Sequence, residues 1–373
     1  MEKNCNVTNC CSGIHNLGDL TAFLTAVNKK ESLKPWQDEN GVINMWNDID
    51  LKGQEIPDCR SFAGTFDGNG HILSGFHLRK QVYCALFDYL EESGILRNLK
   101  VIGSIDVTGS YSGLIGINKG LIQNCYFKGD HNGPGYLGGI TGYNEQCGRI
   151  IECKYIGNII NNGSGYCSGI TGLNEGTIIA CQVICNIQSQ GYTGLITGLN
   201  RGTISRSICS GSVTCTSCYC GGVTGCNEGD ISGCDCSCNI FGATSTPYYN
   251  AGGIAGINEG NINSCTFSGQ IQSTEHGGIA GLNWKLIDSC VCRKLTTSVE
   301  NAQGGGIAGD VYSDGIIINS HNEHYISKSK STGRIAYSNS HNNIITNCSW
   351  RGDKEEKGVI KGNDSTLRLD VKL

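Results

Sequence analysis

The sequence predicts an all-β protein: a single right-handed parallel β-helix (β-solenoid) of about eleven coils with a short N-terminal capping helix. Two observations lead to this fold class. A motif that starts with Gly and an aliphatic residue recurs every 25–31 residues, and Gly supplies 55 of the 373 residues while Pro supplies 4. Many Gly and few Pro suit tight turns and exclude a collagen-like chain. The motif copies begin at Gly113, Gly139, Gly169, Gly194, Gly222, Gly253, Gly278 and Gly306.

Each repeat unit contains three short β-prone stretches. In residues 253–277 these are Gly253-Ile-Ala-Gly, Ile262-Asn-Ser-Cys265-Thr-Phe and Gly269-Gln-Ile271. None of them has room for a helix, and strands this short are stable only beside neighbours. Stacked coils supply those neighbours as parallel strands, so we expect three sheets along the solenoid. The Ile of the motif is expected to point inward, as one ladder formed by Ile140, Ile170, Ile254 and Ile279.

The two ends are expected to close the solenoid. Residues 15–60 hold a capping helix and an entry strand, because residues 17–27 place their leucines and Val27 on one helical face. Residues 61–348 hold the repeats. Residues 349–373 are rich in charged side chains and end in an alternating apolar and charged stretch, which predicts a charged C-terminal cap.

The repeats resemble a known family. The form Gly-Gly-Ile-x-Gly-x-Asn-x-Gly-x-Ile-x-x-Cys is similar to the GLUG repeat, and Asn47-Asp-Ile-Asp-Leu51 resembles the coils that open such proteins. The resemblance covers roughly residues 15–350. It implies a parallel β-helix similar to those of bacterial surface and adhesin-like proteins. GLUG repeats also occur as an accessory region in some streptococcal immunoglobulin A metallopeptidases.

Cysteine is unusually frequent, with 23 of the 373 residues. Seven of them share one repeat position, three residues after an Ile. We expect this column to be buried and to act as small apolar side chains. Disulfides between coils are the alternative, although parallel in-register geometry disfavours a continuous series of them. The column consists of Cys125, Cys153, Cys181, Cys234, Cys265, Cys290 and Cys348.

A denser group of cysteines lies between residues 209 and 238. Cys215-x-x-Cys218 resembles half of a zinc site, but the expected second half is absent. Cys234, Cys236 and Cys238 alternate instead, and on a strand successive members would lie about 6.6 Å apart, too far for a shared metal. Local disulfides or free thiols are therefore favoured over zinc.

The polar N-terminal arm, residues 1–14, carries Cys5, Cys10 and Cys11. No apolar neighbours in the sequence would bury these thiols. They are either incidental to a frayed terminus or, as we hypothesise, cross-links to another copy of this chain.

An Asn follows the first motif Gly by five residues, or by six in the copy at Gly194. Stacked Asn side chains can pass amide hydrogen bonds from coil to coil, so we interpret this column as structural. The next position carries charges in five coils, at Glu145, Glu175, Arg201, Glu228 and Glu259. A solvated face is favoured there over a calcium site between the last two. The Asn column is Asn118, Asn144, Asn174, Asn200, Asn227, Asn258 and Asn283.

No catalytic pattern emerges from the sequence. Asp48, Asp50, Asp67 and His71 lie in entry segments that are expected to be turns, and carboxylates do not gather on neighbouring coils elsewhere. The metallopeptidase signature His-Glu-x-x-His, a nucleophile elbow and a phosphate loop are all missing. We therefore predict a non-enzyme without cofactor or metal.

The predicted function is that of a structural solenoid on a cell or spore surface, or in a fibre, which associates with copies of itself through cysteines. An adhesin that binds a glycan or protein is the alternative, and a polysaccharide lyase or hydrolase is the third. The net charge of −5 argues against nucleic-acid binding. No apolar run is long enough for a membrane span. No signal segment follows Met1, so an extracellular location requires that one was removed or is not needed.

Overall fold

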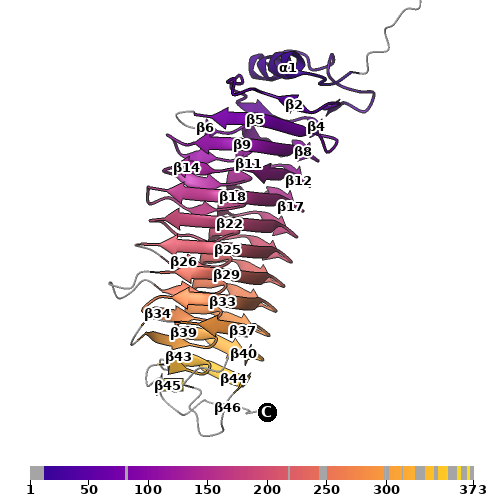
Figure 1. The fold of residues 1–373 in the computed structure, drawn as a ribbon. Helices are drawn as coiled ribbons and strands as arrows, with labels where there is room; N and C mark the ends of the chain where they lie inside the picture. Colours follow the sequence, from indigo (N-terminus) through magenta and orange to yellow (C-terminus); the bar gives the residue numbers. More distant parts are fainter. Residues whose placement is uncertain are drawn as a thin grey trace, which may run out of the picture.

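Each turn of the chain contributes up to four short strands, and each strand pairs in parallel with its counterpart in the next turn. Figure 1 shows the resulting stack, with the helix at one end and β46 (Arg368–Leu369) at the other. The computed structural model is thus a right-handed parallel β-solenoid of about ten turns with one short N-terminal helix, which confirms the predicted fold class. It describes residues 12–79, 83–216, 219–242, 250–297, 299, 302–312, 314–323, 332–339, 343–351, 359–362 and 368–369.

Four rows of strands run along the solenoid, one more than expected. The stretch expected at residues 262–267 is divided between two rows, the stretch at 269–271 belongs to the second of these, and a further row precedes the motif. We name the rows by a characteristic feature. The tyrosine row comprises β6 (Tyr83–Cys84), β10 (Tyr111–Ser112), β15 (Tyr136–Gly138), β19 (Cys167–Ser168), β26 (Cys220–Gly221), β30 (Ala251–Gly252), β34 (Glu275–Gly277), β38 (Gln303–Gly305) and β42 (Thr332–Gly333). These strands form sheets of four and five strands, which isolated bridges at Thr193 connect.

The asparagine row follows the motif in each turn and forms a 12-stranded sheet. It comprises β3 (Ser61–Phe62), β7 (Phe87–Leu90), β11 (Ile115–Asn118), β16 (Thr141–Asn144), β20 (Thr171–Asn174), β23 (Thr197–Asn200), β27 (Thr224–Asn227), β31 (Ala255–Asn258), β35 (Ala280–Asn283), β39 (Ala308–Val311), β43 (Ala336–Asn339) and β45 (Val359–Gly362).

The isoleucine row and the long row share a 25-stranded sheet. The isoleucine row comprises β1 (Val42–Asn44), β4 (Thr65–Asp67), β8 (Ile95–Arg97), β12 (Leu121–Gln123), β17 (Arg149–Ile151), β21 (Thr177–Ile179), β24 (Thr203–Ser205), β28 (Asp230–Ser232), β32 (Asn261–Asn263), β36 (Leu286–Asp288), β40 (Ile316–Ile318), β44 (Ile344–Trp350) and β46 (Arg368–Leu369). The long row comprises β2 (Ile49–Asp50), β5 (Ile72–Leu78), β9 (Lys100–Asp106), β13 (Tyr126–Lys128), β14 (His131–Gly133), β18 (Lys154–Asn161), β22 (Gln182–Ser189), β25 (Ile208–Cys215), β29 (Asp235–Phe241), β33 (Thr266–Gln272), β37 (Val291–Thr296) and β41 (His321–Asn322).

The corner between the isoleucine and long rows is a single residue in the left-handed region. Ala180, for example, has φ 53° and Glu152 has φ 56°. Equivalent residues at the same corner of other turns have nearly the same φ. One left-handed residue turns the backbone sharply, at a cost for side chains other than Gly. The same corner includes Asn98, Asn124, Arg206, Gly233, Ser264, Ser289, Asn319 and Asn347.

The motif glycines lie where consecutive turns approach each other most closely. A Cβ atom at Gly253 would collide with the carbonyl oxygen of Gly278 and with the ring of Phe267. The neighbouring Ile254 is fully buried, as are Ile140, Ile170 and Ile279, which confirms the inward ladder. The copy at Gly194 is offset by one residue: Thr171 pairs with Thr197, so Leu195 takes the place of Gly169 and Asn200 stays in register.

Helix α1 (Leu17–Lys29) seals the first turns. The Asn16 side chain caps its N-terminus by accepting a hydrogen bond from the backbone N–H of Asp19 (3.1 Å). Phe23 packs against the rings of Phe62 and Phe66, each at 5.9 Å between centroids. Most of the predicted C-terminal cap, and the arm up to residue 11, lie outside the described residues.

Candidate functional site

The Asn column forms a continuous ladder inside the solenoid. Each Asn lies at the end of its strand in the asparagine row and is fully buried. The first six donate a side-chain hydrogen bond to the Asn of the next turn, and the last, Asn283, donates to the carbonyl oxygen of Lys285 at 2.8 Å. Asn174, for instance, donates to Asn200 Oδ1, and Asn200 donates to Asn227 Oδ1, both at 2.8 Å. The other links are Asn118 to Asn144, Asn144 to Asn174, Asn227 to Asn258, and Asn258 to Asn283. This ladder holds turns together and presents no group to solvent.

The cysteine column is also internal, and it is continued by serines. Each cysteine follows the left-handed corner residue, and its thiol lies near the carbonyl oxygen two residues earlier, at 3.5 Å for Cys181. In two turns Ser207 and Ser320 occupy the same place and donate the same hydrogen bond. Cys125, Cys153, Cys181, Cys234, Cys265, Cys290 and Cys348 are all buried free thiols.

Burial makes these thiols poor nucleophiles. Desolvation raises the pKa of Cys153 and Cys181 well above the usual thiol range, and it raises the pKa of Cys348 to about 11. Thiolates are the reactive form, so a thiol with such a pKa stays protonated and inert at neutral pH. We therefore interpret the cysteine column as part of the packed interior rather than as a redox or metal site.

The second group of cysteines is partly disulfide-bonded. A disulfide joins Cys215 and Cys220, whose Cα atoms are 6.1 Å apart, across the end of β25 and the start of β26. Cys236 and Cys238 point into the core from β29, and their sulfur atoms lie 3.5 Å apart. The residues alternate along the strand as expected, but the two side chains lean toward each other, so their sulfur atoms are closer than the strand repeat of about 6.6 Å.

Surface thiols are rare in this fold. Among the described residues, Cys147 is the one exposed free cysteine. It lies in the turn after β16, where the chain is longer than in neighbouring turns. The candidate cross-linking residues Cys5, Cys10 and Cys11 lie outside the described residues.

The carboxylates of the entry segments are used in local structure. Asp67 is buried, and it accepts hydrogen bonds from Arg97 Nε (2.7 Å) and Asn98 Nδ2 (3.0 Å). Asp48 accepts from the backbone N–H of Ile72 (2.9 Å) and contacts His71 Nδ1 (3.1 Å). These groups are engaged in turn and strand contacts.

Sequence reasoning missed the most distinctive surface feature, a ladder of six tyrosines along the tyrosine row. One tyrosine stands on each of six successive turns, half-buried, with neighbouring ring centroids 4.9–5.6 Å apart. Three neighbouring pairs are stacked within 18° of parallel. The tyrosine ladder consists of Tyr83, Tyr111, Tyr136, Tyr166, Tyr192 and Tyr219. A sequence signal existed, since Tyr136, Tyr166 and Tyr219 each precede a motif Gly by three residues.

The ladder lies against an apolar column on the outer side of the asparagine row. Leu173, Leu199, Cys226 and Ile257 form a second apolar cluster, separate from the interior core, against which four of the tyrosines pack. These side chains alternate with the buried residues of their strands and therefore face outward. The tyrosine rings that cover these side chains form a continuous apolar strip on the surface of the solenoid.

A charged column borders this strip at the turn after each Asn. Arg201 bridges two turns, with its Nε 2.9 Å from Glu228 and its Nη1 3.6 Å from Glu175. Glu175 also accepts a hydrogen bond from the Tyr143 hydroxyl at 2.6 Å. Farther along, Trp284 and Tyr312 take over this position as an exposed stacked pair with centroids 4.6 Å apart.

Two phenols of this face are held in the neutral form. Burial raises the pKa of Tyr166 and of Tyr111 above the ordinary value, and for Tyr111 the phenol of Tyr136 and the carboxylate of Glu145 add to the effect. The face thus combines tyrosine rings, which repeat once per turn, with carboxylates at Glu145, Glu175 and Glu228. Such a surface can bind a ligand, but it offers no nucleophile or bound proton relay.

Comparisons with known proteins give limited similarity. No family model matches the chain. Part of it is 28% identical over 142 residues to halomucin from Haloquadratum walsbyi (strain DSM 16790 / HBSQ001), a match that covers 35% of this chain and 2% of halomucin. A candidate immunoglobulin A1 protease from Bacteroides ovatus has a solved structure that is similar over 77% of each chain, with 17% identity and a TM-score of 0.41.

Proposed function

We propose that this chain is a non-catalytic surface solenoid that binds an extended glycan along its tyrosine ladder. The ladder carries this proposal, because six half-exposed rings repeat at 4.9–5.6 Å on successive turns. Large apolar strips on a soluble surface mark interaction sites. Aromatic side chains dominate such sites, since they combine an apolar ring with a polar tip.

The periodicity favours a glycan over a protein as the ligand. Pyranose rings present C–H groups that stack on aromatic rings, and their hydroxyls bond to carboxylates and phenols. A polymer of repeating sugars would meet one tyrosine ring at each turn, with Glu145, Glu175 and Glu228 beside the strip on three of the turns. A folded protein surface has no such regular repeat.

Two further lines support a role without catalysis at a surface. The entry carboxylates Asp48 and Asp67 are held in structural hydrogen bonds. The repeats resemble the GLUG repeats of surface and adhesin-like proteins, and part of the chain is similar to halomucin. We therefore place the chain outside the cell or at the cell surface. Within the described residues no helix is long and apolar enough to cross a membrane.

Affinity electrophoresis against a panel of polysaccharides tests the proposal. We expect at least one polysaccharide to retard the wild-type chain, and a Tyr166→Ala/Tyr192→Ala variant to bind it about tenfold more weakly or worse, since each lost stacking contact is worth roughly 0.5–1.5 kcal/mol. The control is Tyr126→Ala, a half-buried tyrosine on the long row. Equal loss in both variants, or no retardation by any polysaccharide, would refute the proposal.

A second candidate function is a cross-linked surface layer. Cys147 favours it, as the exposed thiol of the described chain, with Cys5, Cys10 and Cys11 as further candidates. A non-reducing gel of the oxidised protein should then show multimers that disappear with reductant and in a variant with these four residues changed to Ser. A monomer band alone would contradict the cross-linked layer and would leave the glycan-binding proposal unaffected.

A further inference from the structure

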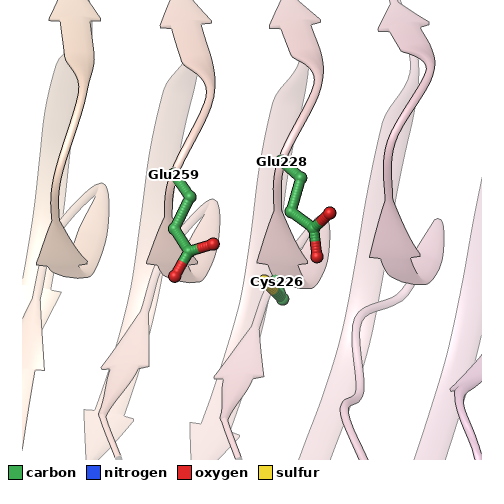
Figure 2. Close-up of side chains that lie close together, drawn as sticks. All are labelled: Cys226, Glu228 and Glu259. Carbon is green, nitrogen blue, oxygen red and sulfur yellow. The ribbon is translucent and has the colours of Figure 1, made fainter.

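We propose that Cys226, Glu228 and Glu259 form a site for a thiophilic divalent cation such as Zn²⁺. The three residues come from two neighbouring turns on the outer side of the asparagine row. Cys226 belongs to β27, Glu228 follows that strand, and Glu259 follows β31 in the next turn. Figure 2 shows the two glutamates side by side with Cys226 next to them on its strand.

The three ligand atoms would fit around one ion if they moved slightly closer together. The ligand atoms, one sulfur and two carboxylate oxygens, all lie within 4.8 Å of one another. Zinc bonds to sulfur at about 2.3 Å and to carboxylate oxygen at about 2.0–2.2 Å, so the ligands of one ion stand somewhat closer together than this. Both glutamate side chains are exposed, and for Glu228 the contraction would replace its 2.9 Å contact with Arg201 Nε. Among the described residues this is the one such group of three potential ligands.

The thiol is the feature that points to an ion. Cys226 stands between two aliphatic residues of its column, Leu199 in the turn before and Ile257 in the turn after. Its side chain is 5% exposed, and its sulfur makes no hydrogen bond within the described structure. Cys226 packs in the outer apolar cluster, and its sulfur also lies next to two carboxylates, where it can serve as a ligand.

The site carries an excess of negative charge, which attracts a cation. Lys119 lies 3.9 Å from Glu145, and Arg201 bridges Glu175 and Glu228, so one carboxylate of the site has a basic partner. No basic residue of the described chain pairs with Glu259. Two like charges on adjacent turns repel, and a divalent ion between them would remove that repulsion.

The donor set selects the metal. A thiolate with two carboxylates and a water gives four ligands of the types that Zn²⁺ accepts, whereas Ca²⁺ and Mg²⁺ take oxygen ligands only. The calcium site considered from the sequence is therefore less suitable than zinc. Burial, followed by Glu259 and Glu228, raises the pKa of Cys226 to about 12. Metal binding must therefore displace the thiol proton.

The test uses Cd²⁺ as a spectroscopic probe for Zn²⁺. The full-length chain carries Cys5→Ser, Cys10→Ser, Cys11→Ser, Cys147→Ser and Cys218→Ser and is kept reduced. Neither the exposed Cys147 nor the thiols outside the described residues then contribute. We expect one equivalent of Cd²⁺ to produce the near-ultraviolet thiolate charge-transfer band, and Zn²⁺ to displace it. The apparent affinity should rise about tenfold per pH unit near neutrality, because one proton leaves.

Variants assign the ligands. Cys226→Ser should abolish the band, and Glu259→Gln should weaken Cd²⁺ binding at least tenfold. Glu145→Gln, in the same charged column but without a neighbouring thiol, should bind Cd²⁺ as the background protein does. Circular dichroism checks that each variant keeps its β structure. Absence of the band in the background protein, or its persistence at full strength in Cys226→Ser, overturns the proposal.

Discussion

At the scale of single residues, the stacked repeats explain why chemically different side chains share one position. The corner before each cysteine is left-handed, and the side chain that follows it fills a buried space, where Cys181 also lies 3.5 Å from the carbonyl oxygen two residues earlier. Leu99 fills the same place without a hydrogen bond in an earlier turn. Cys and Ser both fit this place. The abundance of cysteine in this column is therefore explained by packing and one weak hydrogen bond, without oxidation or metal binding.

The first prediction concerns this column. Changing Cys181 to Ser should lower the free energy of unfolding by no more than about 1 kcal/mol, because Ser207 and Ser320 already make the equivalent hydrogen bond in their turns. Urea unfolding measures the change. In the folded wild type, iodoacetamide should label Cys147 and leave Cys181 unmodified. Rapid labelling of Cys181, or a loss of several kcal/mol in the Ser variant, would contradict the packing role.

The second prediction concerns pH. His131 is fully buried between the rings of Phe127 and Tyr155, and neither ring nitrogen has a hydrogen-bond partner. Burial lowers its pKa to about 3, with nearby Asp130 opposing the shift, whereas the unfolded value is about 6.5. As pH falls below about 6.5, the unfolded chain gains a proton that the folded chain excludes. Stability therefore decreases toward acid, by up to about 1.4 kcal/mol per pH unit.

The matching variant is His131→Ile, since Ile105 and Ile159 occupy the same position in the adjacent turns. We expect its free energy of unfolding to exceed that of the wild type by an amount that grows as pH falls from about 7.5 to about 5. An identical pH dependence in both proteins would show that His131 does not titrate as its burial requires.

At the scale of strands and rows, in-register stacking turns each repeat position into a ladder. The repeat length, the Gly-Ile motif and the Asn that follows it were enough to predict the solenoid and the inward Ile ladder. The corner was not predictable, because Ala180, Glu152 and Arg206 carry no sign in their chemistry that they are left-handed. That corner divides the stretch expected at residues 262–267 between the isoleucine row and the long row. The offset at Gly194 was also hidden, since only the pairing of Thr171 with Thr197 reveals it.

The third prediction tests the asparagine ladder. Asn200 has ladder partners on both sides, whereas Asn118, the first member, has one. Changing Asn200 to Ala leaves a donor on Asn174 and an acceptor on Asn227 unpaired, so we expect a loss of about 2–4 kcal/mol. Asn118→Ala should cost clearly less. Equal losses in thermal or urea unfolding would indicate that the ladder does not transmit its hydrogen bonds between turns.

At the scale of the whole molecule, the solenoid is a rigid scaffold that repeats one surface pattern along its length (Figure 1). The interior ladders hold the turns together, α1 closes one end, and the tyrosine ladder with its charged border forms the face that we propose binds a glycan. That face could not be predicted by aligning the motif alone. Its tyrosines lie before the motif, and their spacing to it differs by one residue at Tyr111.

Hydroxyl-radical footprinting, with oxidation of each tyrosine quantified by mass spectrometry, tests this assignment most directly. The chain is exposed with and without the polysaccharide that binds most strongly in the electrophoresis panel. We predict that oxidation of Tyr136, Tyr166 and Tyr192 decreases together when the polysaccharide is bound, while oxidation of Tyr126 on the long row is unchanged. Protection of Tyr126 with the ladder unaffected, or no change at any tyrosine despite saturation, would contradict the proposed binding face.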